Sequence, residues 1–187
     1  MLIFALFILP LGLAWLMYSG VVEFNRRPTR NEGHLVVPPV AIDWSRAGRM
    51  ANGFSPSDLA GLWVVLHPVP ETCSVTCLER VTELRQVHRA SGRNQERIGI
   101  ALLLETEPTH SQVETLRNIY PAFHLLWQPE PEFIRSLVET RATAGEVDFY
   151  LVDPRGDIMM TYNESDSAAK LSKDLKTLLT WSELDRR

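Results

Sequence analysis

The stretch LWVVLHPVPETCSVTCLERVTELRQV, residues 62–87, contains both cysteines of the chain and decides its fold. It opens with a short apolar run, typical of a buried strand. Apolar residues then recur every three positions, at Val75, Leu78, Val81, Leu84 and Val87. This helical period, with Thr72 or Ser74 as the N-cap and Gly92 as the stop, predicts a strand that leads directly into a helix.

Cys73 and Cys77 lie where the predicted strand meets the helix, with His67 six positions before the first cysteine. On a regular helix their Cβ atoms would be about 5–6 Å apart. A disulfide needs about 3.8 Å, so the first turn would have to open, whereas a metal bridging two thiolates tolerates the wider separation. A copper site, a dithiol switch and a structural disulfide all remain open, beside two inert buried thiols.

The remaining chain alternates strands and helices. After residues 62–92 we expect a buried strand at 98–105, a helix at 111–120, a short strand at 123–127, a helix at 131–142, a hairpin at 147–162 and an amphipathic helix at 167–181. This order predicts an α/β sheet with crossover helices and an antiparallel edge, an arrangement of the thioredoxin-like kind. Reactive groups of such sheets gather beyond the carboxyl ends of the strands, where both cysteines fall.

The N-terminal stretch MLIFALFILPLGLAWLMYSGVV, residues 1–22, contains no charged residue and is long enough to span a bilayer. We therefore expect three parts: a transmembrane anchor at 1–22, an entry segment or linker at 23–60, and a thioredoxin-like domain at 61–187. A cleaved signal peptide is the competing interpretation. Arg26, Arg27 and Arg30 follow the span, which by the positive-inside rule would leave the domain in the cytoplasm unless the true start lies upstream of Met1.

The net charge of −4 and the sequence pI near 5.7 argue against nucleic acid as a partner, because phosphate binding needs a basic stripe. The chain has no H-E-x-x-H motif, phosphate loop or dinucleotide fingerprint. Of the functional signals considered, only the two cysteines therefore remain as candidates for the chemistry of the protein.

Residues 31–181 resemble the Sco family, membrane-anchored thioredoxin-like proteins of cytochrome c oxidase assembly. The segment NEGHLVVPPVAI, residues 31–42, is similar to their extended N-terminal hairpin, and residues 62–87 resemble their strand, C-x-x-x-C copper motif and helix. The segment VDFYLVDPRGDIMMTY, residues 147–162, resembles the hairpin that ends their fold. The resemblance implies Cys73 and Cys77 as copper ligands or as a reactive dithiol.

Two departures weaken the copper interpretation. Leu78 follows Cys77 where the family has proline, and Gly145 falls where its copper-binding histidine should be. His67 is the nearest substitute ligand, although a histidine at a strand end is more often a surface residue bonded to a loop. His124, Met159 and Met160 are weaker candidates, and the carboxylates of Glu146 and Asp148 suit Cu(I) poorly.

We therefore expect a protein of the bacterial inner membrane with a periplasmic domain, acting in cytochrome c oxidase assembly with an oxidase subunit or another assembly factor as its partner. Cys73 and Cys77 would carry out thiol–disulfide exchange or handle Cu(I), with copper as a possible cofactor. The alternative is a non-catalytic assembly scaffold of the same fold, in which the two cysteines are structural.

Overall fold

The computed structural model describes residues 12, 15, 31–51, 55–145, 147–166 and 168–184. The chain from Asn31 onward forms one compact unit. Its elements are β1 (His34–Ala41), η1 (Trp44–Arg46), β2 (Arg49–Met50), η3 (Pro56–Leu59), β3 (Trp63–Val69), α2 (Val75–Ala90), η4 (Gly92–Arg97), β4 (Ile98–Leu104), α3 (His110–Ile119), β5 (Phe123–Trp127), α4 (Pro131–Ala144), β6 (Phe149–Val152), β7 (Asp157–Tyr162) and α5 (Ala168–Leu184). The predicted order from strand 62–69 to the last helix is confirmed.

These elements build a seven-stranded sheet in the order β1-β7-β6-β3-β4-β5-β2. Strands β3, β4 and β5 run parallel, while β6 and β7 form the predicted antiparallel hairpin. Every residue of β4 is buried, as the continuous apolar run of a central parallel strand requires. The predicted α/β thioredoxin-like class is therefore confirmed.

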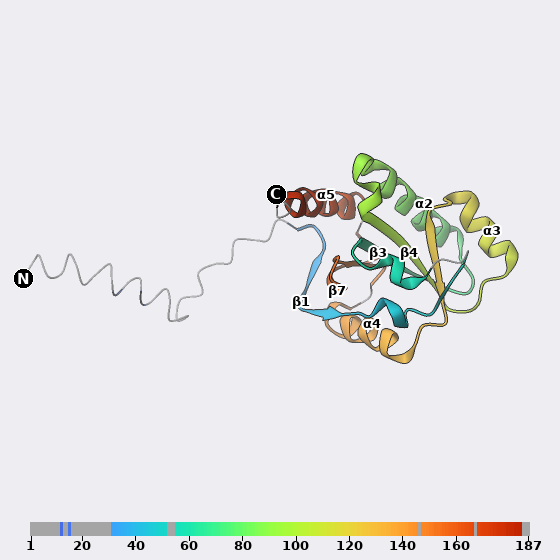
Figure 1. The fold of residues 1–187 in the computed structure, drawn as a ribbon, viewed down its shortest axis with the longest axis horizontal. Helices are drawn as coiled ribbons and strands as arrows, with labels where there is room; N and C mark the ends of the chain where they lie inside the picture. Colours follow the sequence, from blue (N-terminus) through green and yellow to red (C-terminus); the bar gives the residue numbers. More distant parts are fainter. Residues whose placement is uncertain are drawn as a thin grey trace, which may run out of the picture. The chain divides into compact units, whose positions relative to one another are not determined.

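The sheet has a hydrophobic core on each face. Helices α2, α3 and α5 cover one face, and α4 covers the other together with the short helices η1 and η3, as Figure 1 shows. Along β3, Val65 and Val69 enter the first core, whereas Val64 and Leu66 enter the second. This alternation places His67 on the side of α2 and Pro68 on the side of α4.

The segment expected as an entry or linker, residues 23–60, contributes two strands to the sheet. Strand β1 pairs with β7, and β2 pairs with β5 at the opposite edge. The compact unit therefore begins at Asn31, well before the expected boundary at Gly61. The structure corrects the linker expectation because strand pairing, not sequence periodicity, draws these short segments into the domain.

Strand β1 is an irregular edge strand. Its register with β7 shifts between Leu35 and Val40, and the intervening Val37 is 79% exposed. Pro38 and Pro39 follow Val37 and have no backbone N–H to donate. Prolines of this kind are typical of sheet edges.

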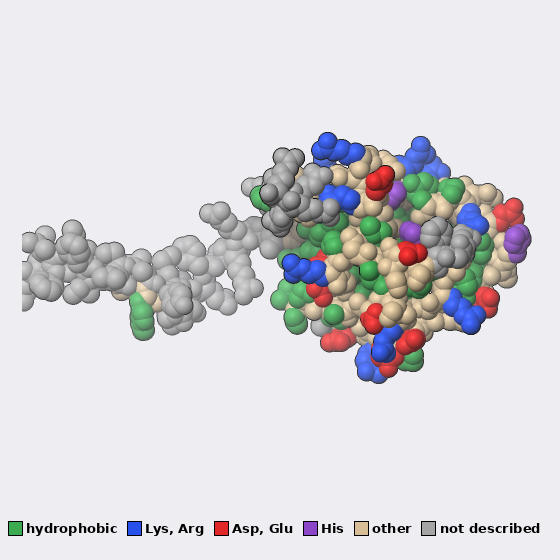
Figure 2. All heavy atoms as spheres, viewed as in Figure 1, with side chains coloured by type: hydrophobic (Ala, Val, Ile, Leu, Met, Phe, Trp, Pro, Cys, Tyr) green, Lys and Arg blue, Asp and Glu red, His purple; other side chains and the backbone are tan. Residues whose placement is uncertain are grey.

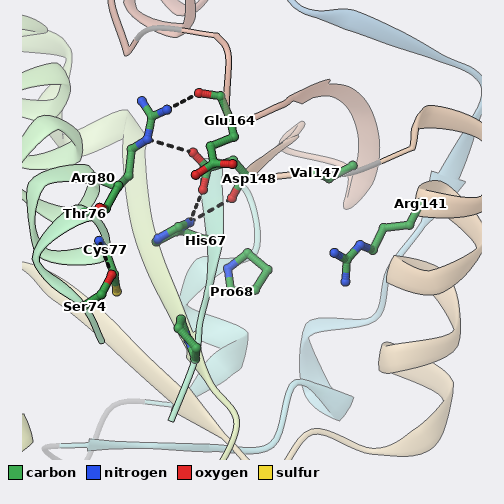
Figure 3. A pocket seen from close by; sticks show the side chains of 11 residues that line it. His67, Pro68, Ser74, Thr76, Cys77, Arg80, Arg141, Val147, Asp148 and Glu164 are labelled. Carbon is green, nitrogen blue, oxygen red and sulfur yellow. Dashed lines mark hydrogen bonds and ion pairs between the residues drawn. The ribbon is translucent and has the colours of Figure 1, made fainter. Parts of the chain in front are cut away.

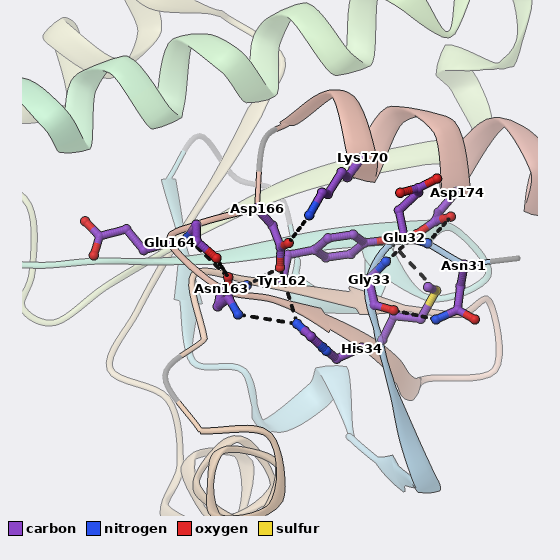
Figure 4. A network of polar contacts seen from close by, with 12 residues as sticks. Asn31, Glu32, Gly33, His34, Tyr162, Asn163, Glu164, Asp166, Lys170 and Asp174 are labelled. Atoms are coloured by element: carbon purple, nitrogen blue, oxygen red, sulfur yellow. Dashed lines mark hydrogen bonds and ion pairs between the residues drawn. The ribbon is translucent and has the colours of Figure 1, made fainter. Parts of the chain in front are cut away.

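Asp174 of α5 fixes the start of the domain (Figure 4). Its buried carboxylate accepts hydrogen bonds from the backbone N–H groups of Glu32 and Gly33 at 2.8–3.0 Å and from the Tyr162 hydroxyl at 2.9 Å. A Cβ at Gly33 would lie 2.5 Å from the Tyr162 ring, so only glycine allows this close approach. The cluster ties together β1, β7 and α5.

Basic and acidic side chains are interspersed over the face of the domain drawn in Figure 2. Apart from residues 12 and 15, the predicted anchor at 1–22 lies outside the described residues. Among the residues that are described, no helix is both long and apolar enough to cross a membrane.

Candidate functional site

Cys73 and Cys77 form a disulfide at the start of α2, with their Cα atoms 5.3 Å apart. The helix begins at Val75 with Ser74 as its N-cap, and the Cys77 N–H donates to Ser74 Oγ at 3.3 Å. Cys73 precedes the cap and lies outside the helix. The wide Cβ separation expected for two helical cysteines therefore does not apply, and the first turn need not open to form the bond.

The partly buried disulfide lies between two hollows of the surface. Cys77 lines a pocket of about 240 Å³, which we call the disulfide pocket, together with His67, Arg80 and Asp148. Cys73 lines a second hollow of about 390 Å³ between the start of α2, the end of β4 and α3. Both sulfur-bearing residues are thus reachable, each from a different side.

His67 is buried, which corrects the expectation of a surface residue at the end of the strand. Its Nδ1 lies 2.8 Å from the Asp148 carbonyl oxygen and 3.3 Å from Asp148 Oδ1, and its ring packs against Phe149 with centroids 5.1 Å apart (Figure 3). Both oxygens are acceptors, so Nδ1 carries the hydrogen. Nε2 is left with a lone pair and, in the described part of the chain, with no hydrogen-bond partner.

Burial lowers the pKa of His67, and Arg80 acts in the same direction, while the carbonyl and carboxylate of Asp148 oppose them. His67 is therefore a neutral imidazole at neutral pH. Burial raises the pKa of Asp148, opposed by the nearby His67 and Arg80. Arg80 Nε lies 3.3 Å from Asp148 Oδ2, which pairs this partly buried carboxylate with a cation.

Arg80 holds the α2 side of the disulfide pocket in place. Its guanidinium donates to the Glu164 carbonyl, lies 3.0 Å from Glu83 Oε2 and sits over the Phe149 ring at 6.0 Å. Sequence reasoning missed this residue, although a signal was present. Arg80 follows Cys77 by three positions on the same helix, a spacing that places both side chains on one face.

The remaining candidate ligands lie elsewhere or serve the core. His124 is on β5, where burial lowers its pKa. Met160 is buried and Met159 is half-buried, as the alternation of a strand predicts. Gly145 ends α4 with a φ of 80°, and Glu146 lies outside the described residues.

The fold and the cysteine pair define a thioredoxin-like protein with a closely spaced disulfide. A family described as "Transmembrane-like, thioredoxin-like, C-terminal domain" matches residues 63–182, and the chain belongs to that family. No curated protein matches the chain.

Solved structures with the same fold include two Sco1 proteins. Apo Sco1 from Thermus thermophilus matches with a TM-score of 0.60 at 17% identity, over 81% of this chain and 99% of that one. Copper-bound yeast Sco1 matches with a TM-score of 0.55 at 14% identity, over 79% and 93%. The thioredoxin domain of a thiol-disulfide oxidoreductase from Bacteroides vulgatus matches with a TM-score of 0.51 at 16% identity, over 78% and 96%. At these identities the likeness shows the fold alone.

The arrangement does not fit a three-ligand copper site. The sulfurs of Cys73 and Cys77 are bonded to each other, and Gly145 has no donor side chain. Within the described residues, no three His, Cys, Asp or Glu side chains are grouped so that they could hold a metal ion. The expected ligand set of Cys73, Cys77 and His67 is therefore not assembled while the disulfide is closed.

Proposed function

We propose that the protein carries out thiol–disulfide exchange with the Cys73–Cys77 pair as its reactive group. The observation that carries this proposal is the position of the disulfide. It lies at the N-terminus of α2, beyond the carboxyl end of β3, and between two hollows that expose Cys73 and Cys77 from different sides. A purely structural disulfide would gain nothing from this access.

The exchange takes place in two steps. A thiolate of a partner dithiol attacks one sulfur of the pair, the bond between Cys73 and Cys77 breaks, and the other cysteine leaves as a thiolate with the electron pair. The partner's second thiolate then attacks the mixed disulfide and releases the first cysteine. The partner loses two electrons and two protons, which reduce Cys73 and Cys77 to thiols.

The site stabilises a departing thiolate. Val75, Thr76 and Cys77 begin the helix, whose N-terminal N–H groups favour negative charge. The Arg80 guanidinium lines the same pocket as Cys77.

Equilibration of the whole protein with mixtures of reduced and oxidised glutathione tests the proposal. We expect the pair to titrate reversibly between disulfide and dithiol, as counted by thiol labelling. Cys73→Ser and Cys77→Ser should each remove the disulfide, and the remaining thiolate should attack oxidised glutathione, release one glutathione thiolate and accumulate as a mixed disulfide. Thr76→Ser, which keeps a hydroxyl in the same pocket, is the matched control and should titrate like the wild type. A folded protein whose disulfide withstands every glutathione mixture would contradict exchange.

For the biological setting, we propose assembly of cytochrome c oxidase at the bacterial inner membrane, with an anchor at residues 1–22 and the domain in the periplasm. The Sco-like sequence pattern and the likeness to Sco1 structures support this setting. Cu(I) is a second candidate substrate. Reduction would supply two soft thiolates, and the unpartnered Nε2 of His67 lies in the wall of the pocket that Cys77 shares.

Complementation of cells lacking the native gene tests this setting. The double variant Cys73→Ser/Cys77→Ser should fail to restore oxidase activity, and full restoration would instead support the scaffold alternative. Competition of the reduced domain with a Cu(I) chelator separates the substrates. Copper binding that outcompetes the chelator and weakens in His67→Gln favours Cu(I), whereas no binding leaves thiol exchange.

A further inference from the structure

A third hollow, with largely apolar walls, lies beside the disulfide pocket, between α4 and the carboxyl ends of β4 and β5. We call it the α4 groove. It has a volume of about 430 Å³; its charged lining residues are Glu105 and Arg141, and its apolar lining is mainly Leu103, Leu104, Ile134, Leu137, Val138 and Tyr150. This volume suits one or two large side chains of a ligand.

The floor and the rim of the α4 groove differ in exposure. Leu103, Leu137 and Tyr150 are buried and form its floor, and burial raises the pKa of Tyr150 to about 12, so the floor is uncharged at neutral pH. On the rim, Ile134 is 39% exposed and Val138 is 57% exposed. These two residues are four positions apart on α4 and therefore lie side by side on its surface.

The α4 groove is continuous with the disulfide pocket. Pro68 and Arg141 line both hollows. In Figure 3, Cys77 and Arg141 lie on opposite sides of the disulfide pocket, with His67 and Pro68 between them. A ligand that reaches the disulfide can therefore extend past Pro68 and Arg141 onto α4.

Arg141 gives this path a charge. Its side chain is exposed, and within the described part of the chain no carboxylate forms an ion pair with it. An acidic group on a ligand that passes from the disulfide pocket into the α4 groove would meet this guanidinium where the two hollows join. A guanidinium binds a carboxylate through paired hydrogen bonds.

We propose that the α4 groove binds the polypeptide substrate of the exchange reaction, as an extended segment that carries the reacting cysteine, then an acidic residue facing Arg141, then a bulky apolar side chain in the groove. The inference rests on the proposed function and names the substrate class of the same site. A polypeptide suits the path because alternate residues of one extended segment point to the same side and can present three side chains along it.

Three synthetic peptides of equal length test the substrate class. The first contains a cysteine, a glutamate and a leucine in that order; the second replaces the leucine with serine, and the third replaces the glutamate with lysine. At sub-saturating concentration, the first should attack the disulfide of the oxidised wild-type protein, forming a mixed disulfide and releasing one protein thiolate, about tenfold faster than the second, since burying one large apolar side chain gives at least this factor. The third should also react more slowly, and this penalty should disappear in Arg141→Gln.

The Val138→Asp variant tests the groove itself. Its rate with the leucine peptide should fall to about that of the serine peptide, while its rate with glutathione stays unchanged. Val37→Asp makes the same substitution at an exposed valine of β1 and should leave every rate unaltered. Equal rates with all three peptides, or no effect of Val138→Asp, would overturn the α4 groove and leave exchange itself intact.

Binding without chemistry separates the two proposals. A leucine peptide whose cysteine is replaced by serine should shift the backbone amide NMR signals of α4 in the wild type and not in Val138→Asp. If these shifts occur but no thiol reduces the protein, the proposed exchange fails while the groove stands. Unshifted α4 signals would overturn the groove whatever the outcome of the exchange assay.

Discussion

The alternation of side chains along β3 sets the orientation and burial of His67. Val65 and Val69 both enter the core beneath α2 and α5, and His67 stands between them in the same alternation. The period of a strand therefore contained the signal that His67 faces inward. The alternation could not identify the partner, because Asp148 lies just before β6, far along the chain, and fixes the tautomer of His67 through Nδ1.

The buried neutral imidazole of His67 should make the domain sensitive to acid. Its pKa in the folded state lies below the ordinary 6.5, so at pH values under about 6.5 the unfolded chain binds more protons and the free energy of unfolding falls. The stability is fully present above this pH and is lost as the pH drops toward the folded-state pKa. In urea titrations between pH 8 and about pH 5, His67→Gln should lose less stability than the wild type.

His88 and His124 share this direction, since burial also lowers their pKa values, so the variant should retain part of the acid dependence. His88→Gln is the matched control outside the disulfide pocket. It should remove the part of the acid dependence of stability that comes from His88. If the free energy of unfolding depends on pH equally in the wild type and in His67→Gln, His67 is as readily protonated in the folded state as in the unfolded chain.

Among the elements, α2 shows why the disulfide was harder to predict than the helix. The periodicity of residues 75–87 located the helix correctly, but both Thr72 and Ser74 were acceptable caps. A start at Val75 leaves Cys73 outside the helix and permits the disulfide; a start two residues earlier would have separated the two sulfurs. A shift of two residues in the position of the N-cap thus decides whether the two cysteines can form a disulfide or remain two separate thiols.

Helix α5 depends on Asp174 for its attachment to the start of the domain. Asp174→Ala would leave two backbone N–H groups and the Tyr162 hydroxyl without their acceptor, so we expect the free energy of unfolding to fall by about 3 kcal/mol. Urea denaturation followed by circular dichroism measures the change. The control is Lys173→Ala, at the neighbouring position of α5. It removes only the exposed ion pair between Lys173 and Glu32 and should leave the free energy of unfolding unchanged. A similar stability for Asp174→Ala and the wild type would show that water replaces the carboxylate.

At the scale of the whole molecule, the sequence predicted the parallel strands, their crossover helices and the final hairpin, because each has a strong period and clear boundaries. Strands β1 and β2 were not placed in the sheet, since one contains two prolines and the other has only two residues. The disulfide pocket and the α4 groove combine residues from β3, α2, α4 and β6. Such combinations depend on tertiary packing, which local patterns do not encode.

Strand β1 also affects how the protein behaves in concentrated solution. An open sheet border normally offers a ladder of free N–H and C=O groups on which a second chain can grow toward a fibril. Here the successive prolines at 38 and 39 interrupt that ladder, and the register shift bends the border out of line. At the other border, β2 is only two residues long. Both edges of the sheet therefore resist templated aggregation, a property that would suit the proposed thiol–disulfide exchange.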